Sequence, residues 1–251
     1  MIGSVRIAWH SIFALIGGLV GGFVSFRCAR YLVKDDRVYP FAFAVIIGGL
    51  IGGRVAHIVD NPGYYAGDIG KMLDISRGGI GTMGAPIGST IAGLIFSRWL
   101  RLPRGFMFDI SVIGIALGET IGRLGDVVNG EHHGTACDLP WCVRYTHPLT
   151  LGQSTPVHPI GAYDALLMLV IFITLVWLWR RVRGRPPEGR VYFAYLALLG
   201  AGRLLEGFVR VEPVVAFGFT EAEILGALYV VAGLGGLLAA RVAERSRRTP
   251  S

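Results

Sequence analysis

Charged residues are scarce in this sequence. Asp, Glu, Lys and Arg make up 16% of its 251 residues, whereas an average soluble domain contains about 25%. Hydrophobic residues make up 53%, and a soluble fold would have to expose many of them to water. The balance excludes an ordinary soluble enzyme and indicates a polytopic membrane protein.

Cysteine is equally rare. Three cysteines, Cys28, Cys137 and Cys142, are too few for a disulfide framework. Cys137 and Cys142 fall in a predicted outer loop, where a disulfide can form, and the sequence leaves their pairing open. No clear cleavage site follows the first apolar stretch, so that stretch is predicted to be a retained helix and not a secretory signal.

Seven segments are apolar enough to cross a bilayer, which takes about 20 mostly apolar residues. Each is predicted to be a helix, because backbone in lipid must satisfy its own hydrogen bonds. The predicted spans are 8–26, 40–60, 79–98, 107–127, 159–179, 191–210 and 221–240, in one all-α transmembrane domain over 1–251. Glycine pairs such as GGLVGG and GGLIGG predict that the helices pack closely.

The basic residues predict the orientation of the spans. Cytoplasmic loops collect Lys and Arg, and 16 of the 24 basic residues fall in alternate connections or in the C-terminal tail. They are Arg27, Arg30, Lys34, Arg37, Arg98, Arg101, Arg104, Arg180, Arg181, Arg183, Arg185, Arg190, Arg241, Arg245, Arg247 and Arg248. The N-terminus is therefore predicted outside, the C-terminus cytoplasmic and residues 128–158 an extracytoplasmic loop region. Since most of the positive charge marks topology, no nucleic-acid partner is predicted.

A further set of polar residues lies within the predicted spans. At about 1.5 Å per helical residue, Arg54, Arg123 and Arg203 all fall in the outer half of the hydrocarbon core. The groups that share this depth are His10, His57, Glu119, Tyr163, Asp164 and Glu206. Such agreement among separate helices predicts one polar cavity open to the outer leaflet. The inner halves are nearly free of ionisable residues, which speaks against a transporter of anions.

Arginine at headgroup depth predicts an anionic phospholipid as the ligand, because planar, permanently charged guanidinium donors match phosphate. The alternative is internal pairing. Arg123 lies four residues after Glu119, and Glu206 lies three residues after Arg203, which are helical neighbour spacings. The sequence leaves both interpretations open.

Residues 122–134, GRLGDVVNGEHHG, resemble the signature of the prolipoprotein diacylglyceryl transferase family, Gly-Arg-x-Gly-Asn, two apolar residues, then Asn-Gly-Glu-x-x-Gly. Weaker matches lie in family order: GGRVAHIV, RGGIGTMGAPIG, DLPWCVRY, HPIGAYDALL (for the family's His-Pro-x-x-x-Tyr-Glu-Ala) and GAGRLLEGFVRVEP. The resemblance covers most of the chain, from about Val5 to Leu234. The family also has seven spans with the N-terminus outside.

The resemblance implies a multi-pass transferase of the bacterial inner membrane. Such an enzyme moves diacylglyceryl from phosphatidylglycerol to the lipobox cysteine thiol of a prolipoprotein, forming a thioether and releasing glycerol phosphate. The implied partners are phosphatidylglycerol, prolipoprotein signal peptides and membrane lipids, and no cofactor is expected. Arg123 and Arg203, by motif match, should stabilise the departing phosphate. The residues expected to bind substrate are Arg54, Asp126, Asn129, Glu131, Gly134, Tyr163, Glu206 and Arg210.

The chain departs from the family pattern at four positions. The third-span histidine, usually cast as the base for the thiol, is Met83; the first-span Trp-Tyr pair ends in His10; and the signature's first asparagine is Asp126. Glu206 follows Arg203 by three residues instead of four. Because methionine cannot accept a proton, His10 is the candidate base at the matching depth. The departures leave open a homologue that binds lipid or lipoprotein without catalysis.

The outer loop is rich in histidine. Glu131, His132 and His133 are adjacent, and His147 and His158 follow. Their spacing is not the His-Glu-x-x-His pattern of zinc enzymes, and adjacent histidines on a helix point in different directions. No metal site is predicted.

Overall fold

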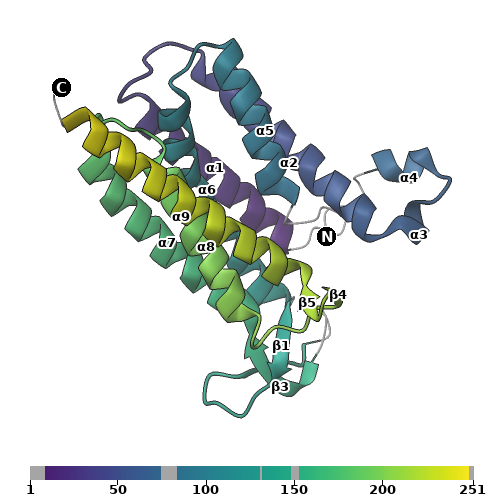
Figure 1. Cartoon of the computed structure of the whole chain (residues 1–251). Helices are drawn as coiled ribbons and strands as arrows, with labels where there is room; N and C mark the ends of the chain where they lie inside the picture. The colour runs from purple at the N-terminus through teal and green to yellow at the C-terminus, as the bar shows by residue number, and fades with distance from the viewer. Residues whose placement is uncertain (1–8, 75–83, 131, 148–152, 249–251) are drawn as a thin grey trace. The chain divides into compact units, whose positions relative to one another are not determined.

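Helices dominate the structure, as the apolar segments predict. A computed structural model describes residues 9–74, 84–130, 132–147 and 153–248 (Figure 1). Its helices are α1 (Trp9–Ala29), α2 (Val38–Asp60), α3 (Pro62–Tyr65), α4 (Ile69–Leu73), α5 (Gly84–Trp99), α6 (Arg104–Asn129), α7 (Ile160–Val182), α8 (Arg190–Glu206) and α9 (Glu221–Arg248). Its strands are β1 (His133–Ala136), β2 (Val143–Tyr145), β3 (Gln153–Pro159), β4 (Val214–Ala216) and β5 (Phe219–Thr220). Each of the seven predicted spans therefore contains a helix.

Five of these helices, α1, α2, α6, α7 and α9, are long and apolar enough to cross a membrane. Within the described residues, α5 has 16 residues and α8 has 17, which is shorter than the length of about 20 that a span needs. α8 ends at Glu206 instead of continuing to 210, because the chain turns away immediately after the polar Arg203–Glu206 pair. The chain is a multi-pass membrane protein with five candidate spans in the described residues.

The chain divides into two compact units, residues 29–107 and residues 1–28 together with 108–251. In the smaller unit, the glycines of GGLIGG lie directly against α5. A Cβ added to Gly88 would lie 2.1 Å from the carbonyl oxygen of Gly48, and one added to Gly52 would lie 2.4 Å from that of Gly84. Only glycine permits these backbones to approach so closely, so the predicted close packing of α2 is confirmed.

The larger unit has a core made by α6, α7 and α8. Its buried side chains include Ile113 and Ala116 on α6, Ile171 and Leu175 on α7, and Val191 on α8. α9 lies along α8, and Figure 1 shows the yellow α9 beside the yellow-green α8. Asp109 joins two of these helices, because its carboxylate accepts hydrogen bonds from the backbone N–H groups of Gly189 and Tyr192, both at 2.9 Å. These bonds satisfy donors that the first turn of α8 would otherwise leave without partners.

Glycines also set the contact between α1 and α6. A Cβ on Gly21 would lie 2.2 Å from the carbonyl oxygen of Gly114, whereas a Cβ on the adjacent Gly22 would meet nothing within 4 Å. We therefore expect Gly21→Ala to lower the unfolding free energy by about 1–3 kcal/mol, the usual cost of overpacking. Gly22→Ala is the matched control and should leave stability unchanged or slightly improved. Thermal unfolding in detergent measures both, and equal melting temperatures for the two variants would contradict the close contact.

The chain is mostly helical, as predicted, but the prediction of an all-α chain missed short strands in two connections. Between α6 and α7 lies a three-stranded antiparallel sheet in the order β1-β3-β2. Between α8 and α9, β4 and β5 form an antiparallel hairpin. Residues 128–158 were predicted only as an extracytoplasmic loop region. Segments outside the apolar helices can satisfy their backbone hydrogen bonds by pairing as strands. β3 ends at Pro159 and leads directly into the first turn of α7.

Candidate functional site

The polar end of α6 carries the signature residues. Arg123, Asp126 and Asn129 are spaced three residues apart, so they lie along one side of the helix. The helix ends at Asn129, and Gly130 follows with φ of +67°, a left-handed conformation that favours glycine after a helix. The Asn-Gly step of the signature is thus the point where α6 stops and the chain turns toward β1.

Three arginines converge on the carboxylate of Asp164, in the first turns of α7. Arg203 Nη1 donates to Asp164 Oδ1 at 3.2 Å, and Arg210 Nη1 donates to the same oxygen at 3.3 Å. Arg123 Nη1 lies 3.3 Å from Asp164 Oδ2. Guanidinium groups from α6, from α8 and from the segment after α8 therefore meet at one side chain, as their shared predicted depth indicated for Arg123 and Arg203.

Further carboxylates surround the same arginines. Asp126 Oδ2 accepts a hydrogen bond from Arg123 Nη1 at 3.0 Å. Glu206 Oε2 accepts one from Nη1 of Arg203 and one from Nη1 of Arg210, both at 3.1 Å. The predicted internal pairing is confirmed for Arg203 with Glu206. Arg123 forms its ion pairs with Asp126 and Asp164, and the alternative pair with Glu119 is not among the ion pairs of the described residues.

This arginine–carboxylate cluster is largely buried. We define it as Arg123, Asp126, Asp164, Arg203, Glu206 and Arg210. Asp126 is 0% exposed, Asp164 3% and Arg203 5%. Burying charges carries a large desolvation cost, and a buried pair is rarely more stable than apolar packing in its place. Ionisable groups inside a membrane protein therefore point to function, and the cluster is the strongest candidate site in the described chain.

The ion pairs occupy only one edge of the guanidinium groups. Arg123 and Arg203 make all of their described contacts through Nη1. Their Nε and Nη2 atoms have no hydrogen-bond partner among the residues that the structure describes, which leaves three N–H donors on each side chain. In the same part of the chain, the buried Glu206 Oε1 also has no partner. The cluster thus has both fixed cations and donors that remain available to an anion.

Two histidines border Asp126. His10 Nδ1 on α1 forms a hydrogen bond with Asp126 Oδ1, and His132 Nε2 lies 3.9 Å from Asp126 Oδ2. Burial lowers the pKa of His132 below its usual range, although the carboxylate of Asp126 acts in the opposite direction. His132 is thus neutral at neutral pH, and its approach to Asp126 is not a charged pair under those conditions. His132 was not among the residues predicted for the site.

Gly134 has a backbone role beside the cluster. It pairs with Arg210 in an antiparallel bridge, and the N–H of Thr135 donates to the carbonyl of Val209 at 2.8 Å. A Cβ on Gly134 would lie 2.6 Å from that same carbonyl oxygen. A larger residue would push β1 away from the segment that carries Arg210. The contact of Gly134 with substrate stays a prediction.

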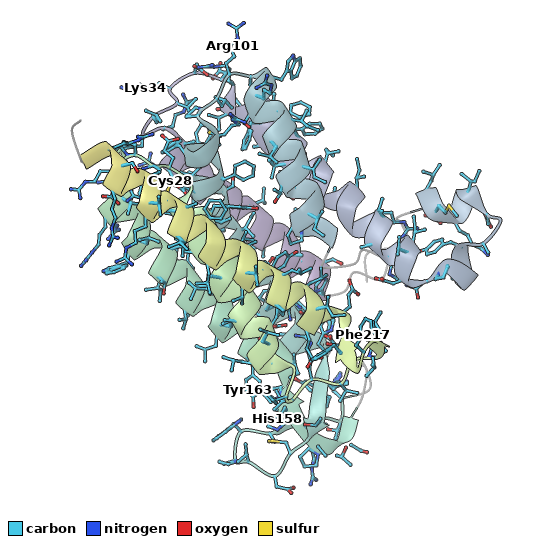
Figure 2. The ribbon with its side chains drawn as sticks, viewed as in Figure 1. Cys28, Lys34, Arg101, His158, Tyr163 and Phe217 are labelled. Carbon is cyan, nitrogen blue, oxygen red and sulfur yellow. A yellow bond between two sulfur atoms is a disulfide. The ribbon has the colours of Figure 1, made fainter. Side chains whose placement is uncertain are left out.

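Tyr163 lies in the first turn of α7, one residue before Asp164. Its hydroxyl accepts a hydrogen bond from Trp141 Nε1 at 2.8 Å and lies 3.0 Å from His158 Nδ1. Figure 2 shows His158 and Tyr163 together where β3 meets α7. These contacts fix the start of α7, and hence the position of Asp164, against the sheet of β1, β3 and β2.

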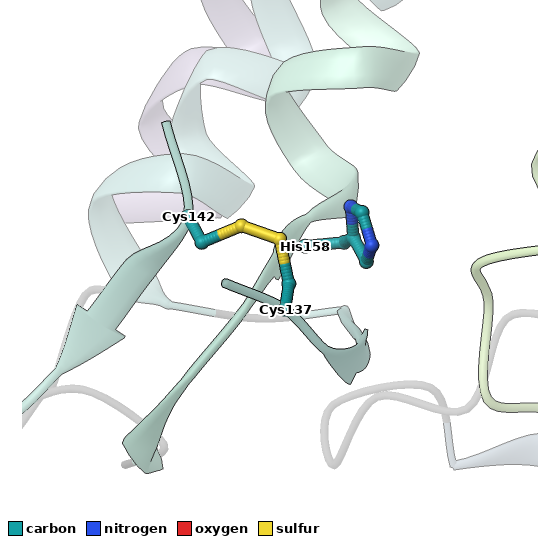
Figure 3. Close-up of side chains that lie close together, drawn as sticks. All are labelled: Cys137, Cys142 and His158. Atoms are coloured by element: carbon teal, nitrogen blue, oxygen red, sulfur yellow. A yellow bond between two sulfur atoms is a disulfide. The ribbon is translucent and has the colours of Figure 1, made fainter. Parts of the chain in front are cut away.

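The cysteines that the sequence left open form a disulfide. Cys137 and Cys142 are joined, and Figure 3 shows the ring of His158 beside them. The ligand atoms of these three residues lie within 4.8 Å of one another, close enough to share a metal ion. The disulfide, however, uses both sulfur atoms, and a metal needs them as free thiolates. The group is therefore a disulfide that links the residue after β1 to the residue before β2.

Arg54 belongs to the smaller unit. Its Nε donates to the carbonyl of Met72 at 2.9 Å, and its Nη2 donates to those of Lys71 and Asp74 at 2.6 and 2.7 Å. The guanidinium carbon also lies 5.2 Å from the centre of the Tyr65 ring. These contacts anchor the C-terminal end of α4 onto α2. The predicted contact of Arg54 with substrate stays a prediction.

The remaining expected residues are placed in part. Asn129 is half-buried at the end of α6, and its contact with substrate stays a prediction. Glu131 and Met83 lie outside the described residues. Asp164 was predicted to lie at the right depth but was not among the predicted site residues. Its position at the acidic residue of the family's His-Pro-x-x-x-Tyr-Glu-Ala segment was the available signal.

Known proteins of one family match nearly the whole chain. Residues 1–239 match the family model described as prolipoprotein diacylglyceryl transferase. A protein of Dehalococcoides mccartyi is 31% identical over 236 residues, covering 91% of this chain and 87% of its own. Proteins of Clostridioides difficile, 29% identical over 92% of this chain and 90% of theirs, and Synechococcus elongatus, 30% identical over 94% and 84%, are also similar. All three are named phosphatidylglycerol–prolipoprotein diacylglyceryl transferase.

Proposed function

The chain belongs to the prolipoprotein diacylglyceryl transferase family, and we propose that its arginine–carboxylate cluster is where the reaction takes place. The protein is a phosphatidylglycerol–prolipoprotein diacylglyceryl transferase. In this reaction the sulfur of a lipobox cysteine attacks a glycerol carbon of phosphatidylglycerol, and the carbon–oxygen bond to phosphate breaks. The products are a thioether and glycerol phosphate, so negative charge gathers on the departing phosphate oxygen.

The available edges of Arg123 and Arg203 supply the charge that this step needs. Each can donate through Nε and Nη2 to a phosphate, while Nη1 stays bonded to carboxylates. Asp164 holds the two guanidinium groups in fixed positions before the lipid arrives. Donors that are already oriented need no reorganisation as charge develops, and a site without water increases their effect. This arrangement is the observation that carries the proposal.

The other cluster residues act around that phosphate. Arg210, bonded through Nη1 to Asp164 and Glu206 and through Nε to Glu212, positions the carboxylates and adds positive charge. Glu206 Oε1, buried without a partner in the described chain, can accept a hydrogen bond from a hydroxyl of the glycerol headgroup. His10 takes the proton of the attacking thiol. Tyr163 and Asn129 line the approach from the outer surface.

The arrangement in the membrane follows from the same cluster. The cluster joins the N-terminal ends of α1 and α7 to the C-terminal ends of α6 and α8. Those ends all lie on one side if the chain spans the bilayer seven times with α5 and α8 included. With the basic loops cytoplasmic, that side is the outer one, the N-terminus is outside and 128–158 is extracytoplasmic. The protein then resides as a single transmembrane domain in the bacterial inner membrane, among prolipoprotein signal peptides and lipid.

A lipid-binding homologue without catalysis is the second candidate, favoured by Met83 in place of the family's histidine. Expression of the chain in cells depleted of their own transferase separates the two functions. We expect thioether-linked diacylglyceryl on prolipoprotein, detected by mass spectrometry, and its loss in the Arg123→Ala variant. Failure of the wild-type chain to lipidate, while it is folded and inserted in the membrane, would instead support the binding function.

A further inference from the structure

Two of the departures from the family pattern touch each other. His10, at the second position of the first-span aromatic pair, and Asp126, at the first asparagine of the signature, are 116 residues apart in sequence and are joined by a hydrogen bond from His10 Nδ1 to Asp126 Oδ1. We propose that His10 and Asp126 form a catalytic dyad in which Asp126 positions His10 as the base for the substrate thiol. The inference rests on the transferase function proposed above.

The geometry of the contact fixes which nitrogen is basic. The carboxylate of Asp126 can only accept when ionised, so Nδ1 carries the proton in its bond to Oδ1. The lone pair of the neutral ring is then on Nε2, the nitrogen that points away from Asp126. A carboxylate that bonds one ring nitrogen of histidine in this way sets the tautomer and the orientation of the other.

His10 is partly exposed and Asp126 is buried, and a base must be exposed in this way to reach a substrate thiol. The Asp126 side chain is 0% exposed, whereas that of His10 is 46% exposed. The carboxylate is thus enclosed by protein, and the ring that it orients is partly exposed. Arg123 already supplies a positive charge to Asp126. A histidine that served only to neutralise Asp126 would therefore be redundant, and it would be expected to be buried inside the cluster.

Gly125 brings the two helices together at this point. A Cβ on Gly125 would lie 2.8 Å from His10 Cα and 3.2 Å from its backbone nitrogen. α1 therefore also lies close to α6 beside the dyad. The close contact places the ring of His10 within reach of Asp126. A larger residue at position 125 would push α1 away from α6 at this point.

The dyad links the base to the leaving group. Asp126 Oδ1 bonds His10, and Asp126 Oδ2 bonds Arg123 Nη1 at 3.0 Å. In the step, the thiol proton moves to His10 Nε2 while the sulfur electron pair forms the bond to the glycerol carbon. The electron pair of the broken carbon–oxygen bond goes to the phosphate, held by Arg123. The imidazolium then returns its proton to the released glycerol phosphate or to water, which restores the neutral ring.

Kinetics of purified enzyme in lipid nanodiscs, with phosphatidylglycerol and a lipobox peptide, test the dyad. We expect His10→Ala to lower kcat on the order of 100-fold or more, with the KM for phosphatidylglycerol little changed, and added imidazole to restore part of the rate. His10→Asn keeps a donor for Asp126 but has no basic nitrogen, so it should be equally slow. If His10→Asn retains the wild-type rate, the contact is structural and the dyad is wrong.

A double-mutant cycle assigns the role of Asp126. If Asp126 acts through His10, Asp126→Asn should lower kcat in the wild-type background but cost little more in the His10→Ala background. If the losses of kcat from Asp126→Asn and His10→Ala instead multiply in the double variant, Asp126 acts only through Arg123, and the proposal that it positions His10 is overturned. A wild-type enzyme that transfers no lipid would overturn the transferase function and the dyad together. An active wild type with a full-rate His10→Ala variant overturns the dyad alone.

Discussion

Replacing Asp164 with asparagine should be among the most damaging single substitutions in the described chain. The change removes the charge that Arg123, Arg203 and Arg210 share, and it leaves buried cations without their common partner. Breaking a buried ion pair by removing one member typically costs about 3–5 kcal/mol. We expect a large loss of folded protein and of thermal stability, measured by size-exclusion chromatography and thermal unfolding in detergent.

Two controls define this result. Asp35→Asn removes an aspartate that also pairs with an arginine, Arg37 at 2.7 Å, but at the surface; because exposed ion pairs contribute little, stability should stay unchanged. Asp164→Glu keeps the negative charge and should recover most of the folded protein. If Asp164→Asn unfolds at the wild-type temperature, Asp164 does not hold the three arginines together.

Replacing Arg203 with lysine should abolish most of the transfer while the protein stays folded. Lysine keeps the positive charge beside Asp164 and Glu206, so the buried network retains its balance. It lacks the planar fork of donors with which arginine binds carboxylate on one edge and phosphate on the other. Loss of one preorganised donor group costs on the order of 100- to 1000-fold in rate, and we expect a fall in kcat of that size.

The control for this prediction is Arg190→Lys. Arg190 also pairs with a carboxylate, Glu244 at 3.3 Å, but it stands at the opposite end of α8 from Arg203. Its replacement should leave the transfer rate at the wild-type level. Equal activity of Arg203→Lys and the wild type would show that the fork of Arg203 is not needed and that the charge alone suffices.

The two interpretations of the arginines that the sequence left open turn out to be compatible. Arg203 pairs with Glu206 as its spacing predicts, and this pairing uses Nη1 alone. The other edge of the same guanidinium is left without a partner in the described residues. Internal ion pairs and ligand binding therefore need not compete, since the first orients the donors that the second requires.

Helices and their polar ends could be predicted from the sequence, because hydropathy and helical rise depend only on local order. The convergence on Asp164 could not, since Asp164 is 41 residues after Arg123 and 39 before Arg203, and no spacing rule relates them. The predicted depths indicated only that Arg123, Asp164 and Arg203 lie at the same depth in the membrane. The contact between His10 and Asp126 was likewise out of reach, because it depends on how closely Gly125 lets α1 approach α6.

Arg54 shows the limit of the depth argument. Its predicted depth matches that of Arg123 and Arg203, yet in its own unit it donates to the carbonyls of Lys71, Met72 and Asp74. An arginine near a helix end can satisfy either a ligand or the carbonyls that end a neighbouring helix. Sequence depth does not distinguish these partners. The strands of 128–158 were also missed, because three short strands paired through a bulged register give no clear alternation.

The most direct measurement is the binding of two lipids to the purified protein. Phosphatidylglycerol and diacylglycerol share their acyl chains, but only the first carries a phosphate. Native mass spectrometry of lipid-titrated protein compares their retention by the wild type and by Arg123→Ala, with Arg190→Lys as the control. We predict preferential retention of phosphatidylglycerol by the wild type and the control, and no preference in Arg123→Ala. An undiminished preference in Arg123→Ala would contradict the assignment of the cluster as the phosphate site.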